Sequence, residues 1–520
     1  MKQYPLDGNS LTLDVLANVV YEHEGVLLSA TARKRVKKAQ RLVEEWVASG
    51  ETVYGVTTGF GEFANVRISR SHIEELQENL ILSHAAGAGD PLPPDIVRAM
   101  MVLRANALAK GYSGIRLETL ELLVRMINLD ILPVIPMQGS VGASGDLVQL
   151  AHLVLAMMGK GKVWVTTGKE RTITDSGTAL QRAKLHPLRL SAKEGLALIN
   201  GTQMMTAYAA LAAWRGRNLA KVADITGALS VEALRGSDTP YDDRIHRLRP
   251  YKGQRAVARN LRAMMKGSEI RESHRYDDPR VQDAYSLRCI PQVHGASRDA
   301  IEYVSQIVSI EMNSATDNPL ILPDERIHLE GGNFHGQPIA LALDFLAIGL
   351  AELANIAERR IERLVNGTLS GLPRFLTEKG GLHSGLMIAQ YTAASLVSEN
   401  KVLCHPASVD SIPTSANQED HNSMGSIGAH KVWKVLDNVQ TVLAIEALCG
   451  AQGLDFARRI NGTTPMKAGK GTEAAYQAIR SRIPYLEEDR VLYDDIHKAV
   501  KLVRDSSLIK AVEKHIGVLQ

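Results

Sequence analysis

The chain has 520 residues, of which 45% are hydrophobic and 22% charged, as in an ordinary globular protein with a large core. Its formal net charge of +3 is nearly neutral for this length and argues against a nucleic-acid or acidic-membrane partner. Three cysteines, Cys289, Cys404 and Cys449, are too few and too scattered for a disulfide framework or a metal cluster. We therefore expect a cytoplasmic protein without a bound metal.

The N-terminal part mixes irregular and helical patterns. Residues 1–29 look irregular, with a short extended piece at 11–13, and a helix is predicted from about Thr31 to Ala48, where Ser49-Gly50 ends it. The stretch 53–61 that follows is too rich in glycine for a strand and has too few polar residues for a linker, so we interpret it as a mobile loop that covers something. Further helices are predicted at about 71–83, 94–110 and 116–129.

The loop 138–146 contains Ala143-Ser144-Gly145, a triplet that can turn its own backbone into an electrophile. If the Gly145 nitrogen attacks the Ala143 carbonyl carbon and two waters are lost, a methylidene imidazolone ring results. Glycine suits the attacking position because it has no side chain to block the approach. An ordinary Gly/Ser turn is the alternative, and a phosphate cradle is disfavoured because no Lys-Ser or Lys-Thr follows the glycines. Residues 146–158 are apolar at helical spacing, which places the loop at a helix N-terminus, where negative charge on the ring would be favoured.

Helical periodicity dominates the rest of the chain. After a small β-like excursion at 162–174, helices are predicted at about 191–235, 254–266, 297–315, 336–365, 384–403, 422–449, 467–482 and 487–515. The apolar run 339–357 carries Asp344 and Glu352, so we interpret it as a buried helix and not as a membrane span. We predict a mainly α fold, a long-helix bundle with a smaller mixed N-terminal part. The chain shows only an indistinct boundary near residue 200, between residues 1–200 and 201–520.

Several polar stretches are unusual for plain core helices. One face of a helical turn would carry Gln282, Tyr285 and Arg288 at three-residue spacing. The other stretches are Ser83–Gly87 at a helix end, Asn200–Gln203 within an apolar helix, Gly331–Gln337 between apolar runs, and Ser415–His421 before another helix. Each alone has an ordinary structural explanation, but their occurrence together with the triplet indicates a functional site.

These motifs resemble those of the aromatic amino-acid ammonia-lyase and aminomutase family, from Val53–Gly59 to the helices beyond Ser408–Thr414. The resemblance implies a long-helix bundle of the ammonia-lyase/aspartase-like type and a homotetramer with active sites shared between subunits. It also implies that Ala143-Ser144-Gly145 forms the methylidene imidazolone, so that no separately bound cofactor is needed. The Gly-Ser-Ser loop on which the related aspartase and fumarase enzymes depend is not found in the sequence.

The resemblance further implies roles for individual residues. Tyr54 would remove the β-proton of an amino-acid substrate, which requires an environment that lowers the ordinary phenol pKa of about 10. Arg288 would hold the substrate carboxylate with its planar fork, and Asp146 would assist the cyclisation. Asn200 and Tyr285 would hydrogen-bond the ring and the carboxylate. The side-chain pocket would be lined by His84, Gln282, Phe334, Met387 and Glu419.

Glu419 bears on the choice of substrate, because the phenylalanine enzymes of this family carry glutamine at the matching position. A buried carboxylate needs a donor, which the imidazole of L-histidine supplies, so we expect ammonia elimination that yields trans-urocanate. A tyrosine ammonia-lyase or an aminomutase stays open, since a tyrosine phenol could pair with His84, and a non-catalytic helical scaffold is a more remote alternative. The sequence departs from the family at Val148-Gln149, where Ala-Pro is usual, and at Asn422, where valine is usual.

Overall fold

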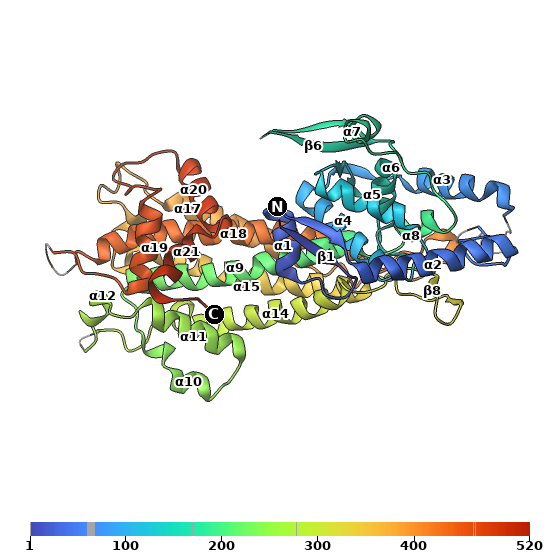
Figure 1. Cartoon of the computed structure of the whole chain (residues 1–520). Helices are drawn as coiled ribbons and strands as arrows, with labels where there is room; N and C mark the ends of the chain where they lie inside the picture. The colour runs from blue at the N-terminus through green and yellow to red at the C-terminus, as the bar shows by residue number, and fades with distance from the viewer. Residues whose placement is uncertain (1, 60–67, 169, 277, 461, 463) are drawn as a thin grey trace. The chain divides into compact units, whose positions relative to one another are not determined.

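The computed structural model describes residues 2–59, 68–168, 170–276, 278–460, 462 and 464–520. The chain divides into two compact units (Figure 1): unit 1 comprises residues 1–214, 304–344 and 406–430, and unit 2 comprises residues 215–303, 345–405 and 431–520. Helices are the main regular secondary structure of both units, which confirms the predicted mainly α fold. The division at residue 200 stays a prediction.

Unit 1 contains the short strands and the helices of the N-terminal part. Its elements are β1 (Gln3–Leu6), α1 (Leu13–Tyr21), β2 (Gly25–Leu28), α2 (Ala30–Ser49), α3 (Ile73–His84), β3 (Ala88–Pro91), α4 (Pro94–Ala109), α5 (Leu117–Asn128), β4 (Leu132–Pro133), β5 (Pro136–Gln138), α6 (Leu147–Met157), β6 (Lys162–Thr167), β7 (Glu170–Asp175), α7 (Ser176–Arg182), α8 (Glu194–Ile199), β8 (Leu320–Leu322) and β9 (Ile327–Leu329). The strands pair as β1-β2 in parallel and as β3-β5, β4-β6-β7 and β8-β9 in antiparallel.

The secondary-structure elements described in unit 2 are helices. This unit holds α10 (Asp243–Arg247), α11 (Lys252–Met264), α12 (Glu269–Glu272), α13 (Tyr285–Arg288), α16 (Gly367–Ser370), α17 (Met387–Leu403), α19 (Lys470–Arg480), α20 (Leu492–Arg504) and α21 (Ser507–Ile516). The boundaries between the units fall inside long helices and one loop; the helices are α9 (Gln203–Ala233), α14 (Ile290–Glu311), α15 (Gln337–Val365) and α18 (Gly425–Ala457).

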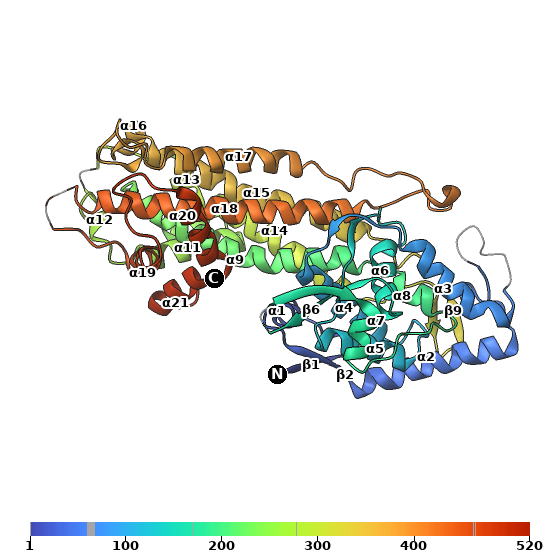
Figure 2. The same cartoon turned by 90° about the horizontal axis from the view of Figure 1, so that it is seen from above.

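A buried ion pair joins the long helices within unit 2. The guanidinium of Arg360 on α15 donates to Glu446 on α18, with 3.0 Å between Nη2 and Oε2. The hydroxyls of Thr226 and Ser230 on α9 also donate to this carboxylate, at 2.6 and 2.7 Å. Figure 1 and Figure 2 show these helices running alongside one another. The carboxylate is therefore compensated by a charge and two hydroxyls, as a fully buried ion requires.

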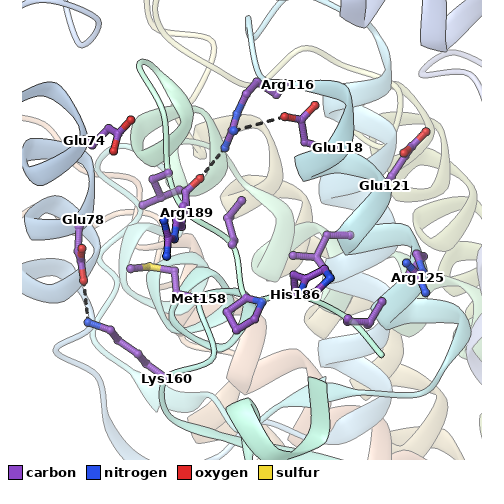
Figure 3. Close-up of a pocket in the computed structure, with 15 residues that line it drawn as sticks. Glu74, Glu78, Arg116, Glu118, Glu121, Arg125, Met158, Lys160, His186 and Arg189 are labelled. Carbon is purple, nitrogen blue, oxygen red and sulfur yellow. Dashed lines mark hydrogen bonds and ion pairs between the residues drawn. The ribbon is translucent and has the colours of Figure 1, made fainter. Parts of the chain in front are cut away.

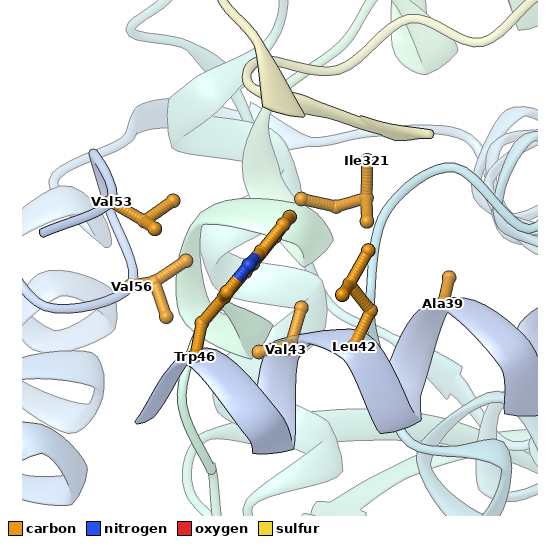
Figure 4. Packing of buried hydrophobic residues seen from close by; sticks show 7 residues of the cluster. All are labelled: Ala39, Leu42, Val43, Trp46, Val53, Val56 and Ile321. Atoms are coloured by element: carbon orange, nitrogen blue, oxygen red, sulfur yellow. The ribbon is translucent and has the colours of Figure 1, made fainter. Parts of the chain in front are cut away.

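An apolar cluster in unit 1 fixes the start of the predicted mobile loop (Figure 4). Its buried members are Ala39, Leu42, Val43, Trp46, Val53, Val56 and Ile321. The first four repeat at helical spacing along α2, and the Trp46 ring meets His328 edge-on at 5.4 Å. Val53 and Val56 flank Tyr54, so the residues on both sides of the predicted base are packed into the core. Phe60 and Gly61, which the predicted loop includes, lie outside the described residues.

Some predicted elements were wrong in type or extent. Residues 1–29 are not irregular, because they form β1, β2 and α1, whose first turn is capped by the Thr12 hydroxyl accepting from the Val15 N–H at 3.2 Å. The helix predicted at 191–235 is two helices, α8 and α9, separated at Gly201, where φ is +151°. The helix predicted at 487–515 is likewise two, α20 and α21, with Ser506 at φ +57° between them.

Helix α15 is long and apolar enough to cross a membrane, with a mean hydropathy of 1.9 over its best 18-residue window. Within the protein, 72% of that window is buried. This burial agrees with the predicted core helix over residues 339–357.

Candidate active site

A pocket of about 590 Å³ in unit 1 brings together many of the predicted site residues. It is lined by Tyr54, Leu80, His84, Ala143, Ser144, Leu147, Leu196, Ile199, Asn200, Asn318, Glu330, Phe334, His335, Ser415, Gln418, Glu419, Asp420, His421 and Asn422. The predicted residues Tyr54, His84, Ala143, Ser144, Asn200, Phe334 and Glu419 are all in this set. Segments more than 300 residues apart in the chain therefore meet at one cavity.

The backbone of Gly201 clamps the Ala-Ser-Gly triplet. The Gly201 nitrogen donates to the Ser144 carbonyl at 3.3 Å, and the Asp146 nitrogen donates to the Gly201 carbonyl at 2.7 Å. Gly145 lies between these bonds with φ +78°, and a side chain there would overlap the Gly201 carbonyl. The Ser140 hydroxyl accepts from the Gly142 nitrogen and donates to the Gly145 carbonyl, both at 3.0 Å. The triplet is therefore held as a tight turn in which only glycine fits at residue 145.

Asp146 is fully buried directly before α6. Its Oδ2 accepts from the backbone nitrogens of Met204 and Met205 at 2.8 and 3.1 Å, in the first turn of α9. Its Oδ1 has no hydrogen-bond partner among the described residues. Burial raises the pKa of Asp146 to about 7, and the nearby carboxylate of Glu311 acts in the same direction. Asp146 can therefore hold or release a proton near neutral pH beside the triplet.

Asn200 lies at the break between α8 and α9 and is oriented by buried charges. Its Nδ2 donates to the Asn318 carbonyl at 3.2 Å and to Asp317 Oδ1 at 3.4 Å. Asp317 is in turn paired with the fully buried Lys193 at 3.0 Å. The NH₂ group of the amide thus faces these acceptors, and Oδ1 has no partner in the described structure.

Arg104 also holds this break between α8 and α9. Its guanidinium is fully buried and donates to the Asn200 carbonyl and to Gln203 Oε1, both at 2.8 Å, and also to the Ala197 carbonyl. Burial lowers the pKa of Arg104 to about 10. These bonds fix the segment that carries Gly201 and therefore the clamp on the triplet.

The half-buried carboxylate of Glu419 faces the triplet and His84. The Ser144 hydroxyl donates to Glu419 Oε1 at 3.4 Å, and the Thr414 hydroxyl donates to Oε2 at 2.8 Å. His84 is the last residue of α3, as predicted, and burial lowers its pKa while the charge of Glu419 opposes this effect. An anion and an imidazole thus lie at one side of the pocket, suited to a polar substrate side chain.

The predicted site residues Gln282, Tyr285, Arg288 and Met387 belong to unit 2 and are not among the residues that line this pocket. Tyr285 and Arg288 share the short helix α13, with the guanidinium 4.6 Å from the ring centre, and Tyr285 is 70% exposed. Gln282 precedes this helix, so the predicted single helical face was wrong for that residue, because the helix begins only at Tyr285.

Sequence reasoning did not assign roles to several pocket residues. The rings of His335 and His421 stack at 5.8 Å, and His335 Nε2 lies 3.1 Å from the His421 carbonyl oxygen. Both histidines belong to polar stretches that the sequence analysis singled out. The polar composition of these stretches was therefore the signal that could have assigned them to the site. Of the departures from the family pattern, Asn422 lines the pocket, whereas Gln149 is buried and donates to the Met137 carbonyl at 3.0 Å.

A larger pocket of about 920 Å³ also lies in unit 1 (Figure 3), and none of the predicted site residues line it. Its walls carry ion pairs such as Lys160–Glu78 and Arg116–Glu118, at 2.7 and 3.3 Å. Charges that neutralise one another in this way are typical of a solvated surface, so we assign the candidate site to the smaller pocket.

Comparisons with known proteins identify the family. The family model "Aromatic amino acid lyase" matches residues 11–481. The chain is 54% identical over 519 residues to the histidine ammonia-lyase of Caldanaerobacter subterraneus subsp. tengcongensis, covering 100% of both chains, and 53% identical over 516 residues to that of Alkaliphilus oremlandii, covering 99% of both. Among solved structures, it is similar to histidine ammonia-lyase from Trypanosoma cruzi, with a TM-score of 0.91, 47% identity and coverage of 99% and 96%. It is also similar to tyrosine aminomutase from Streptomyces globisporus, with a TM-score of 0.92, 37% identity and full coverage of both chains.

Proposed function

Because the chain belongs to the aromatic amino acid lyase family, we propose that it eliminates ammonia from L-histidine to give trans-urocanate. The observation that carries this proposal is the Glu419 carboxylate, which shares one pocket with His84 and lies 3.4 Å from the Ser144 hydroxyl of the triplet. The identity of about 50% to histidine ammonia-lyases over the full length supports the same substrate.

The residues of the triplet fit the methylidene imidazolone that the family implies. Gly145 has the positive φ and the close backbone approach that a tight turn requires, and Ala143 and Ser144 face the pocket. Once formed, the group would supply an electrophile for the substrate amine. Asp146, buried behind the triplet with a pKa near 7, would exchange protons while the two waters leave.

Other residues would bind the substrate and move its proton. Tyr54 lines the pocket and would take the β-proton of histidine, at a loop start that the Trp46 cluster holds in place. Asn200 would present its unpartnered Oδ1 as a hydrogen-bond acceptor. Glu419 would accept the imidazole N–H, which phenylalanine cannot offer.

We further propose that the protein is a cytoplasmic homotetramer. Tyr285, Arg288, Gln282 and Met387 do not line the pocket of unit 1, and in a tetramer with shared sites they would be supplied by neighbouring subunits. Arg288 would then bind the substrate carboxylate through its bidentate fork. Mixing two inactive variants, Tyr54→Phe and Arg288→Met, would test this arrangement, because only shared sites regain activity in mixed tetramers.

A second candidate, a tyrosine ammonia-lyase or aminomutase, has one observation in its favour. His84 lies in the same pocket and could pair with a phenol. Tyrosine would leave Glu419 less well satisfied than histidine does, which is why histidine is preferred here.

The decisive experiment is a substrate panel with the purified protein. L-histidine, L-tyrosine and L-phenylalanine are supplied separately, and ammonia and the ultraviolet absorbance of the products are followed. We expect the wild type to turn over histidine, and Glu419→Gln to lower its kcat/KM about tenfold or more. Ser144→Ala should show no turnover, because the ring cannot form. Intact mass should show the wild type lighter than its sequence by two waters and Ser144→Ala unchanged. Consumption of tyrosine with histidine left intact would contradict the proposal.

A further inference from the structure

The carboxylate of Glu419 is presented by a turn whose ends are bonded to each other. The Thr414 nitrogen donates to the Glu419 carbonyl at 3.0 Å, and the Glu419 nitrogen donates to the Thr414 carbonyl at 3.3 Å. Between them Ser415, Ala416 and Asn417 all have positive φ, at 52°, 52° and 70°. Glu419 and Thr414 are therefore neighbours across a tight, left-handed turn.

Asn422 fastens this turn from within the protein. It is only 1% exposed, and its Nδ2 donates to the Ile412 carbonyl, to the Glu419 carbonyl at 3.4 Å and to Thr414 Oγ1 at 3.4 Å. Carbonyl oxygens only accept hydrogen bonds, so the NH₂ group of Asn422, and not its oxygen, must face the turn.

The direction of the Thr414 hydroxyl follows from that orientation. Because Asn422 Nδ2 can only donate, Thr414 Oγ1 accepts from it, and the single hydroxyl hydrogen is available for Glu419 Oε2 at 2.8 Å. Oε2 is thereby occupied, while Oε1 stays on the side of Ser144, at 3.4 Å. Asn422 thus donates to Thr414, and Thr414 donates to Glu419, in a chain of hydrogen bonds with one direction.

We propose that Thr414 and Asn422 are positioning residues for substrate selection, which hold Glu419 Oε2 so that Oε1 receives the side-chain N–H of the substrate. This inference rests on the proposed function, since it takes the imidazole of histidine as the group that Glu419 recognises. Thr414 is not among the residues that line the pocket, and Asn422, which lines it, is only 1% exposed, so both would act through the carboxylate.

The test compares Thr414→Val, which keeps the shape of the side chain and loses its hydroxyl, with Thr414→Ser, which keeps the hydroxyl. We expect the KM for histidine to rise about tenfold in Thr414→Val, the effect of one hydrogen bond to a charged group, while kcat changes less. Thr414→Ser should restore most of the affinity. The inhibition constant of L-phenylalanine, which has no N–H for Glu419, should be unchanged in both variants. Asn422→Leu, which frees the Thr414 hydroxyl to turn, should raise the histidine KM in the same way and serves if Thr414→Val is insoluble.

Thr472→Val is the matched control, because it removes a buried hydroxyl in unit 2, outside the pocket. It should lower the melting temperature without changing the histidine KM. A wild-type KM in both Thr414→Val and Asn422→Leu would overturn the inference, and so would an equal loss in Thr414→Ser and Thr414→Val, which would indicate packing alone. If the wild type turns over histidine, the proposed function stands whatever the variants show. If it does not, both the proposed function and this inference fail.

Discussion

Gly145→Ala tests how firmly the backbone of Gly201 holds the triplet. The new Cβ would overlap the Gly201 carbonyl and lie 2.9 Å from Gly201 Cα, so backbone on one side must shift. Alanine at φ +78° costs about 1–2 kcal/mol, and overpacking a tightly filled site costs about 1–3 kcal/mol more. We expect a total loss of about 2–5 kcal/mol in the free energy of unfolding. We also expect that the ring does not form in most chains, so that their mass still includes the two waters.

Gly267→Ala is the matched control, because Gly267 has the same φ of +78° but nothing described within 4 Å of an added Cβ. It should lose only the conformational part, about 1–2 kcal/mol. Urea titrations of both variants give the difference due to overlap, and intact mass gives the fraction of cyclised chains. If Gly145→Ala were as stable as Gly267→Ala and fully cyclised, the clamp by Gly201 would have to be abandoned.

The remaining predictions concern buried charges and the apolar cluster. The folded-state pKa of Asp146, about 7, exceeds the ordinary value of 3.8, so between these pH values only the folded chain binds this proton. Relative to Asp146→Asn, the wild type should therefore lose about 1.4 kcal/mol in its free energy of unfolding for each pH unit as pH rises through this window. Urea titrations of both proteins at pH 5 and pH 7 measure this, and an equal change in the two proteins would refute the prediction. Lys193→Met should lower the free energy of unfolding by about 3–5 kcal/mol, because Asp317 would stay buried without its cation, and adding Asp317→Asn should recover part of the loss. Trp46→Ala should cost about 3–5 kcal/mol and speed thermolysin cleavage within residues 51–59, whereas an unchanged cleavage rate would mean that the cluster does not hold this loop.

Helical periodicity located the long helices but not every break in them. The polar residues 200–203 interrupt the apolar pattern from 191 to 235 without an obvious helix stop. The break at Gly201 depends on contacts with Arg104, about a hundred residues away, and with the triplet, about sixty residues away. Helix α1 was missed because its first apolar residue, Leu13, follows Leu11 and Thr12 in what reads as strand alternation. The parallel pairing of β1 with β2 has no local signal at all.

The site was predictable where chemistry resides in consecutive residues. Ala143-Ser144-Gly145 could be identified from its own atoms, and the helix N-terminus after it from spacing. The supporting contacts could not, because Asp317 meets Asn200 across 117 positions of sequence and Lys193 neutralises it across 124. Such partners are defined only by the folded backbone, and no periodicity marks them.

In the left-handed turn Ser415–Asn417, thermal stability is given up to fix the conformation of the pocket wall. At Ser415 and Ala416 the left-handed conformation costs about 1–2 kcal/mol each, and at Asn417 it costs less. The turn is therefore held by its bonds to Thr414, Glu419 and Asn422 against the backbone preference of these residues. Glycine at these positions should raise the melting temperature, because it adopts a positive φ without strain. It should also make the turn more mobile. Tolerance of heat and fidelity of substrate choice should therefore be separable by mutation in this one turn.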